Sequence, residues 1–169
     1  WRINKHIVDV KKQMDKSNPF FRFGIIQSFL LVDEDKVIGN CTAIIDKRNN
    51  DTGLIGYYDC VDDEAASSLL LEAAKSWLKQ NGCKRIDGPV NLTIWHNYRF
   101  ITKGENELEV FDPFNKPYYV TQWLNYGFVT AEKFVSSTRS DFSTIIPSTK
   151  SSYFDLDKNL RIRSFDKNN

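Results

Sequence analysis

The sequence predicts an α+β domain, that is, a mixed α/β arrangement in which helices flank one central and mostly antiparallel sheet. Three observations lead to this fold class. Three strand-like apolar runs follow one another and are separated by short polar turns. One long amphipathic helix comes next, and a short strand-like segment follows that helix. A strand that returns after a helical crossover lies parallel to its neighbour, so we expect one parallel pair in the sheet.

The first three strands are predicted from runs of apolar residues. Ile25–Val32 reads as a buried strand, and the polar residues 33–36 read as the tip of a hairpin. Val37–Ile45 supplies the returning strand, with Gly39 as a candidate bulge. Leu54–Val61 is the third strand, after a turn rich in Asn and Asp. The three strands together predict an antiparallel meander.

The long helix is predicted over Asp62–Asn81, because apolar residues recur there at i, i+3, i+4 and i+7. The apolar stripe consists of Ala65, Ala66, Leu69, Leu70, Ala73, Ala74, Trp77 and Leu78. Three acidic residues suit the positive N-terminal end of this helix, and Gly82 is the expected stop. Lys84–Asp87 then begins a short fourth strand, cut by a Gly-Pro pair.

A second, shorter helix is predicted at Tyr118–Tyr126, ended by Gly127, and a further strand at Phe128–Ser137. Before them lies Asn91–Gly104, an insert dense in aromatic residues. Near the N-terminus, Phe20 and its neighbouring phenylalanines read as a hydrophobic plug under the sheet or as an interface patch.

The ends of the chain differ in composition from its centre. Residues 1–19 are expected to be a lead-in of partly helical spacing, and residues 138–158, rich in Ser and Thr, a linker. Residues 159–169 read either as the start of a second unit or as a final strand of the same sheet. The main domain is therefore expected over residues 20–137.

Composition narrows the class of partner and the compartment. The chain has 169 residues and a net charge of +1, which disfavours nucleic acid as a partner. No apolar run approaches the length of a transmembrane helix, so we expect no membrane segment. The 3 cysteines are widely spaced and the histidines number 2, which suggests no disulfide framework and no metal site. Buried thiols in a reducing compartment indicate a cytoplasmic protein.

The densest group of polar and aromatic residues is Trp95-His96-Asn97-Tyr98-Arg99, just after the fourth strand. His96 is a candidate catalytic base near neutral pH. Trp95, Tyr98 and Arg99 are candidates for substrate binding, the guanidinium of Arg99 for a carboxylate or phosphate. The alternative is that the rings are core residues and that His96 and Arg99 make structural hydrogen bonds.

The element order and one later motif resemble the GNAT acyltransferase superfamily. The matching stretches are Ser28–Asp46, Leu54–Gly82 and Asn115–Val135, the last of which contains NKPYYVTQWLNYGF. GPVNLTIWHNYRFITKG followed by FDPFNKPYY resembles a poorly characterised bacterial branch of GNAT-like proteins in which two GNAT-like halves follow one another. NLRIRSFD, residues 159–166, is similar to the strand that opens a GNAT domain.

The resemblance implies acyl transfer from acetyl-CoA to a small-molecule amine acceptor by the parent protein. It implies a cofactor site at the end of the central strand, with candidates Tyr58, Cys60, Val61 and Asn115. The candidate catalytic groups that it adds to His96 are Asp59, or its neighbour Asp62, as a base, and Tyr119, or Tyr126, as an acid, the alternative being packing and capping roles. The expected partner is a second GNAT-like half or a second copy of the chain.

The sequence also departs from the GNAT pattern, which keeps a second function open. The segment between Val61 and Leu69 has neither glycine nor a basic residue, although the family's pyrophosphate loop is rich in glycine. It carries Asp62, Asp63 and Glu64 instead, and Trp123 stands where many members have a tyrosine acid. The alternative is therefore a non-catalytic GNAT-like structural or binding module, and whether this half alone is an enzyme stays open.

Overall fold

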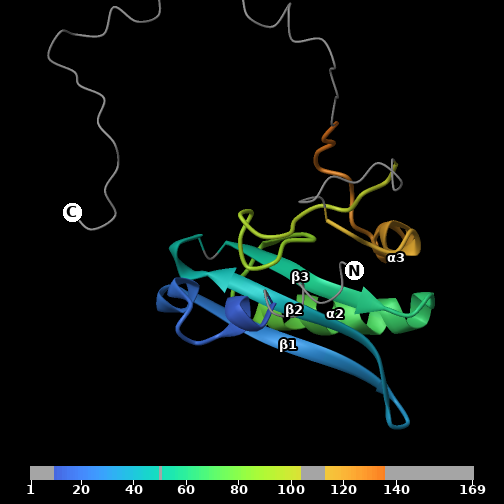
Figure 1. Cartoon of the computed structure of the whole chain (residues 1–169), viewed down its shortest axis with the longest axis horizontal. Coiled ribbons are helices and arrows are strands. Elements are labelled where there is room, and N and C mark those ends of the chain that lie inside the picture. Colours follow the sequence, from blue (N-terminus) through green and yellow to red (C-terminus); the bar gives the residue numbers. More distant parts are fainter. Residues whose placement is uncertain (1–9, 50, 104–112, 136–169) are drawn as a thin grey trace, which may run out of the picture. The chain divides into compact units, whose positions relative to one another are not determined.

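The structure, a computed structural model, describes residues 10–49, 51–103 and 113–135. The chain divides into two units, residues 1–129 and residues 130–169, and every helix and strand below belongs to the first. The described sheet contains β1 (Gly24–Asp33), β2 (Lys36–Asp46), β3 (Thr52–Cys60) and β4 (Arg85–Asp87) in that order (Figure 1). The first three strands are antiparallel, and β4 is parallel to β3. The mixed α/β class and the parallel pair are thus confirmed.

Two α-helices accompany the sheet, α2 (Glu64–Gln80) and α3 (Tyr118–Tyr126). The side chain of Asp63 accepts a hydrogen bond from the Ala66 N–H at 2.7 Å and so caps α2. Gly127 ends α3 in the left-handed conformation, with φ of 112°. Both predicted helices are confirmed, since the caps lie where the sequence pattern indicates them. Short 3-10 helices occupy Pro19–Arg22 (η1) and Lys47–Asn49 (η2), and residues 10–14 are helical.

The larger core lies between the sheet and α2. Its buried members are Cys41, Ala43, Ile45, Ile55, Leu70, Leu71, Ala74, Leu78, Cys83 and Trp123. Ile25, Phe29 and Leu31 of β1 pack against this core. Because side chains alternate along a strand, the even-numbered residues of β1 point to the opposite face of the sheet.

A smaller core covers one end of that opposite face. Phe20 is 4% exposed and packs with Ile44 and Leu92, which confirms the predicted plug. The ring of Phe20 meets Phe21 and Phe23 edge to face, at centroid distances of 5.6 and 5.5 Å. These aromatic contacts cover the start of β1, whereas Leu30 and Val32 near its end are 65% and 53% exposed.

Two irregularities bend the central strands. The β1–β2 register shifts between Leu31 and Val32, next to Gly39, where the sequence suggests a bulge. In the β2–β3 pair, Asn40 lies opposite Asp59 but Thr42 lies opposite Gly56, so β3 holds one additional residue there. Tyr57, within this second bulge, has a φ of 49°. The second bulge re-aims the end of β3 and has no signal in the sequence pattern.

One predicted element is wrong in the part that the structure describes. Residues 128–135, the described portion of the strand expected at Phe128–Ser137, contain neither helix nor strand. Val129 and Val135 are 84% and 88% exposed, whereas Phe128 packs against the larger core. The expectations for residues 1–9 and 136–169 lie outside the described residues. Among the described helices, none combines the length and the apolar character needed to cross a membrane.

Candidate functional site

The candidate site begins where β3 parts from β4. The two strands pair only through Thr52–Leu54 and Arg85–Asp87. The chain after β4 still follows β3 for a short distance, since the Val90 N–H donates to the carbonyl of Ile55 at 2.9 Å. The side chain of Asn91 then accepts the N–H of Tyr57 at 2.7 Å. Beyond this point the end of β3 is bonded by a different element, α3.

Side chains on one face of α3 bond the end of β3 and the start of α2. The hydroxyl of Tyr118 donates to the carbonyl of Cys60 at 3.0 Å. The amide of Gln122, one turn later, donates to the carbonyl of Val61 at 2.7 Å. Asn125, in the following turn, donates to the carboxylate of Glu64. Residues three and four apart share a helix face, so a single face of α3 makes all these bonds.

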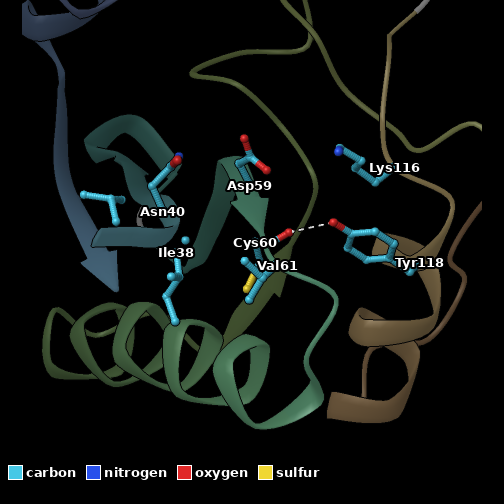
Figure 2. A pocket seen from close by; sticks show the side chains of 9 residues that line it. Ile38, Asn40, Asp59, Cys60, Val61, Lys116 and Tyr118 are labelled. Atoms are coloured by element: carbon cyan, nitrogen blue, oxygen red, sulfur yellow. Dashed lines mark hydrogen bonds between the residues drawn. The ribbon is translucent and has the colours of Figure 1, made fainter. Parts of the chain in front are cut away.

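A pocket of about 230 Å³ lies beside these contacts. It is lined by Val37, Ile38, Gly39, Asn40, Asp59, Cys60, Val61, Lys116 and Tyr118. Figure 2 shows the side chains of Asn40 and Asp59 directed to the side of the sheet away from α2, with Lys116, from the segment before α3, extending toward Asp59. An amide, a carboxylate and an ammonium group therefore surround one opening. The carboxylate of Asp59 can bind the amine of a polar ligand, whereas the ammonium group of Lys116 is suited to an uncharged or anionic part of that ligand.

The carboxylate of Asp59 is oriented by a hydrogen bond from Tyr119. The hydroxyl of Tyr119 donates a hydrogen bond to Asp59, and the side chain of Tyr119 is 5% exposed. Burial, and then the hydrogen bond to Asp59 and its negative charge, raise the pKa of Tyr119 above the ordinary value for tyrosine. Tyr119 thus remains a neutral donor that orients Asp59. The structure brings together two of the predicted catalytic residues.

Tyr58, a candidate for cofactor binding, lies between α2 and α3. Its hydroxyl contacts Ser67 Oγ at 2.8 Å and donates to Gln122 Oε1 at 2.8 Å. Its ring meets Tyr119 and Trp123 edge to face, at 5.1 and 5.4 Å. Burial raises the pKa of Tyr58. Its side chain therefore belongs to the packing that supports the site.

Asn115, another candidate for cofactor binding, bonds the backbone of Ile101 through both ends of its amide. Its Oδ1 accepts the N–H of Ile101 at 2.7 Å, and its Nδ2 donates to the carbonyl of Ile101 at 3.2 Å. These bonds imitate the pairing between strands, with a side chain in place of one backbone. Asn115 thus attaches the end of the aromatic insert to the segment that leads into α3.

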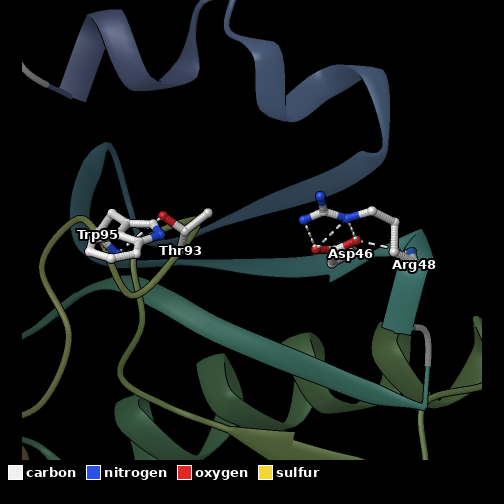
Figure 3. Close-up of polar contacts among 4 residues, drawn as sticks. All are labelled: Asp46, Arg48, Thr93 and Trp95. Carbon is white, nitrogen blue, oxygen red and sulfur yellow. Dashed lines mark hydrogen bonds and ion pairs between the residues drawn. The ribbon is translucent and has the colours of Figure 1, made fainter. Parts of the chain in front are cut away.

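The aromatic insert forms a separate group. Val90 and Tyr98 form a β-bridge that closes the loop between them. Inside the loop, His96 Nδ1 lies 3.0 Å from the hydroxyl of Thr93, and the Trp95 N–H donates to the same hydroxyl. Figure 3 shows Trp95 on the side of the sheet away from α2, and its side chain is 89% exposed.

Arg99 and Tyr98 belong to the same loop and contact each other there. The guanidinium of Arg99 donates to the hydroxyl of Tyr98 at 2.9 Å. The residues that line the pocket include neither of them, nor His96 or Trp95. The structure therefore divides the predicted residues into a pocket group around Asp59 and a loop group around His96.

Several residues of the site escape prediction from sequence. Asn40 and Lys116 line the pocket, and Gln122 supports it. The sequence contains a signal for two of them. Asn40 is a residue type that is rare inside strands, and Gln122 is a polar residue close to Tyr119 and Trp123, both of which are buried. Neither signal shows which residues these side chains lie beside. Asn40 meets Asp59 only because the bulge in β3 sets the two residues opposite each other.

Cys60 and Val61, candidates for cofactor binding from the GNAT resemblance, lie at the end of β3 and just after it. The carbonyls of Cys60 and Val61 already accept hydrogen bonds from Tyr118 and Gln122. The first turn of α2 offers no compensation, because Asp63 caps it and Glu64 adds a further carboxylate. No group of three His, Cys, Asp or Glu side chains suited to a metal occurs within the described ranges.

Comparisons with known proteins give two relatives and no family. No family model and no solved structure matches the chain. The chain is 27% identical over 127 residues to Protein YghO of Escherichia coli, which is 72% of this chain and 33% of that protein. It is 33% identical over 85 residues to the bacterial ceramide synthase of Caulobacter vibrioides, which is 47% of this chain and 22% of that protein. The chain thus spans a third or less of the length of these curated relatives.

Proposed function

We propose that the full-length protein is an N-acyltransferase and that this chain forms the half that binds the amine acceptor. The observation that carries the proposal is the Asp59 carboxylate, directed into a pocket and held by Tyr119. A carboxylate in such a position binds an ammonium group by a charge-assisted hydrogen bond. The bacterial ceramide synthase supports the chemistry, because a ceramide is an amide of a fatty acid and an amino alcohol.

Asp59 has two tasks in this proposal. It binds the acceptor as an ammonium group beside the amide of Asn40, and it accepts the proton that this group must lose before its nitrogen can attack. The neutral nitrogen then forms a bond to the acyl carbon of the acyl-CoA, the bond from that carbon to sulfur breaks, and the second nitrogen proton goes to the departing thiolate. Tyr119 does not line the pocket, so it acts as a positioning residue that fixes the carboxylate.

The acyl donor is assigned to another part of the protein. Acetyl-CoA is the donor implied by the GNAT resemblance, but in this half Asp63 and Glu64 place carboxylates at the start of α2, where the resemblance puts the pyrophosphate. We therefore assign the donor to a second GNAT-like half or to a second copy of the chain. The cytoplasm is the compartment that supplies acyl-CoA thioesters.

Replacement of Asp59 in the full-length protein tests this function. We expect Asp59→Asn to lower kcat/KM for an amine acceptor by about 10²–10⁴, the range typical for loss of a general base. Tyr119→Phe keeps the ring and removes only the hydrogen bond to Asp59, so its loss should be smaller. Asp62→Asn is the matched control, because Asp62 is an exposed carboxylate that does not line the pocket. Equal turnover in Asp59→Asn and the control would contradict the proposal.

A second candidate function is a non-catalytic binding module. The observation that favours it is the acidic start of α2, where Asp63 caps the helix and Glu64 adds a second carboxylate. Under this alternative the full-length protein binds amines through Asp59 but forms no amide. Amine binding that depends on Asp59, without acyl transfer from any acyl-CoA, would support the module over the enzyme.

A further inference from the structure

Three large apolar side chains lie exposed beside the pocket. Leu30, Val32 and Val37 are 65%, 53% and 59% exposed. We call these three residues the apolar strip. They come from the two strands that form the β1–β2 hairpin, beyond the part of the sheet that the Phe20 plug covers. Single exposed apolar residues are ordinary, but three that adjoin one another and a polar pocket suggest a ligand.

The apolar strip lies on one face of the sheet. Phe29 and Leu31 pack against the core on the α2 side, so Leu30 and Val32 point to the opposite face. Leu30 is the cross-strand partner of Asn40, and Val32 is the partner of Val37. Side chains of directly paired residues stand next to each other on the same face. The strip therefore runs from beside Asn40 toward the tip of the hairpin.

The strip and the pocket are continuous. Val37 belongs to both, and Asn40 lies in the pocket wall next to Leu30. Asp59 lies opposite Asn40 in the register of β2 and β3. A ligand that places a positive group on Asp59 can thus extend an apolar tail along Val37, Val32 and Leu30. From Asn40 to Val37 this path measures about 10 Å, at about 3.3 Å per residue.

We propose that the apolar strip binds the hydrocarbon chain of the acceptor, which is a long-chain primary amine. This inference rests on the proposed function, and it adds the substrate class and the residues that select it. The charge of Asp59 complements the ammonium group, and the uncharged strip complements the chain. An anionic lipid surface is disfavoured as the occupant, because the hairpin tip next to the strip carries Asp33, Glu34 and Asp35 against one cation, Lys36.

Calorimetric binding of two straight-chain amines to the full-length protein tests the inference. The probes are butylamine and octylamine, each below its aggregation concentration. We expect the affinity to rise about twofold per added methylene. This value assumes that each methylene of the bound chain is half buried on the strip. The double variant Leu30→Ser with Val32→Ser should lower octylamine affinity severalfold and leave butylamine affinity unchanged. Leu69→Ser is the matched control, because Leu69 is 63% exposed but belongs to α2.

Asp59→Asn separates failure of this inference from failure of the proposed function. If butylamine binding requires Asp59 and the strip variant abolishes the gain with chain length, the inference stands. If butylamine binding requires Asp59 but octylamine binds no tighter, or the strip variant matches Leu69→Ser, the inference is overturned and the proposed function remains. If neither amine responds to Asp59→Asn, the acceptor site itself is wrong.

Discussion

At the scale of single residues, two consecutive tyrosines of β3 have different surroundings because of the bulge between β2 and β3. The hydroxyl of Tyr57 donates to Gln13, which precedes the sheet. The hydroxyl of Tyr58 lies among α2 and α3, where it contacts Ser67 and Gln122. Tyr58 therefore connects the central strand to both helices next to the pocket.

The role of Tyr58 leads to a prediction about stability. Tyr58→Phe leaves the buried hydroxyl of Ser67 and the carbonyl of Gln122 without this partner, at a cost of about 1–3 kcal/mol. Urea denaturation measures the free energy of unfolding. Tyr118→Phe is the control, because it removes one hydrogen bond from a half-buried tyrosine and should cost about 1 kcal/mol. A smaller loss for Tyr58→Phe than for the control would contradict this account.

At the scale of elements, the approach of the aromatic insert to β3 depends on Gly56. A Cβ atom at Gly56 would lie 2.0 Å from the carbonyl oxygen of Val90. Val90 also donates its N–H to Ile55, so the two backbones are in direct contact. This contact determines where β3 parts from its neighbour and thus where the pocket begins.

The contact at Gly56 predicts a difference between two glycine substitutions in one strand. Gly56→Ala must displace backbone and should destabilise the protein by about 3 kcal/mol or more, at the upper end of overpacking effects. Gly53→Ala meets only the flexible end of Leu78, at 2.6 Å, and should cost about 1–2 kcal/mol. Thermal or urea unfolding of both variants measures the difference. Equal losses of stability in the two variants would contradict this account, because they would mean that the backbone at Val90 moves away from a Cβ at position 56 at little cost in free energy.

At the scale of the whole molecule, the three cysteines report on the integrity of the core. Cys41, Cys60 and Cys83 are 1%, 3% and 6% exposed, and none forms a disulfide. Burial raises the pKa of the Cys41 thiol to about 12 and also raises that of Cys60 and Cys83. Because the thiolate is the reactive form, these thiols are protected both by packing and by protonation.

We therefore expect the native protein to resist alkylation by iodoacetamide near pH 8.5, where an ordinary thiol is half ionised. The same thiols should react rapidly in concentrated guanidinium chloride. Mass spectrometry counts the modified cysteines in each state. Rapid modification of Cys41 under native conditions would contradict the packing between the sheet and α2, since its sulfur lies against the carbonyl of Leu70.

Much of the fold could be predicted from the sequence, because the relevant signals are local. The 3.6-residue repeat of α2, its acidic start and Gly82 act within a few turns of chain. The crossover from β3 through α2 requires a parallel β4, which the structure confirms. The strand expected at Phe128–Ser137 failed over its described residues, because an alternating pattern does not provide a neighbouring strand.

The site was less accessible from sequence. Asp59 and Tyr119 are candidates through a family resemblance, and the structure joins them by a hydrogen bond. Asn40 and Lys116 enter the pocket only through contacts between segments far apart in the chain. His96 and Arg99 are conspicuous by composition, yet His96 contacts Thr93 and Arg99 donates to Tyr98, both in the same loop.

The sequence by itself determined the order of strands and helices, the parallel pair and the places where both helices end, since these depend on periodicity and on caps within a few residues. Only the tertiary structure decided which side chains share the pocket. Two non-local features make that choice, the bulge in β3 that sets Asp59 opposite Asn40 and the side chains of α3 that bond the end of β3. Both depend on packing between distant segments, for which no local pattern provides a signal.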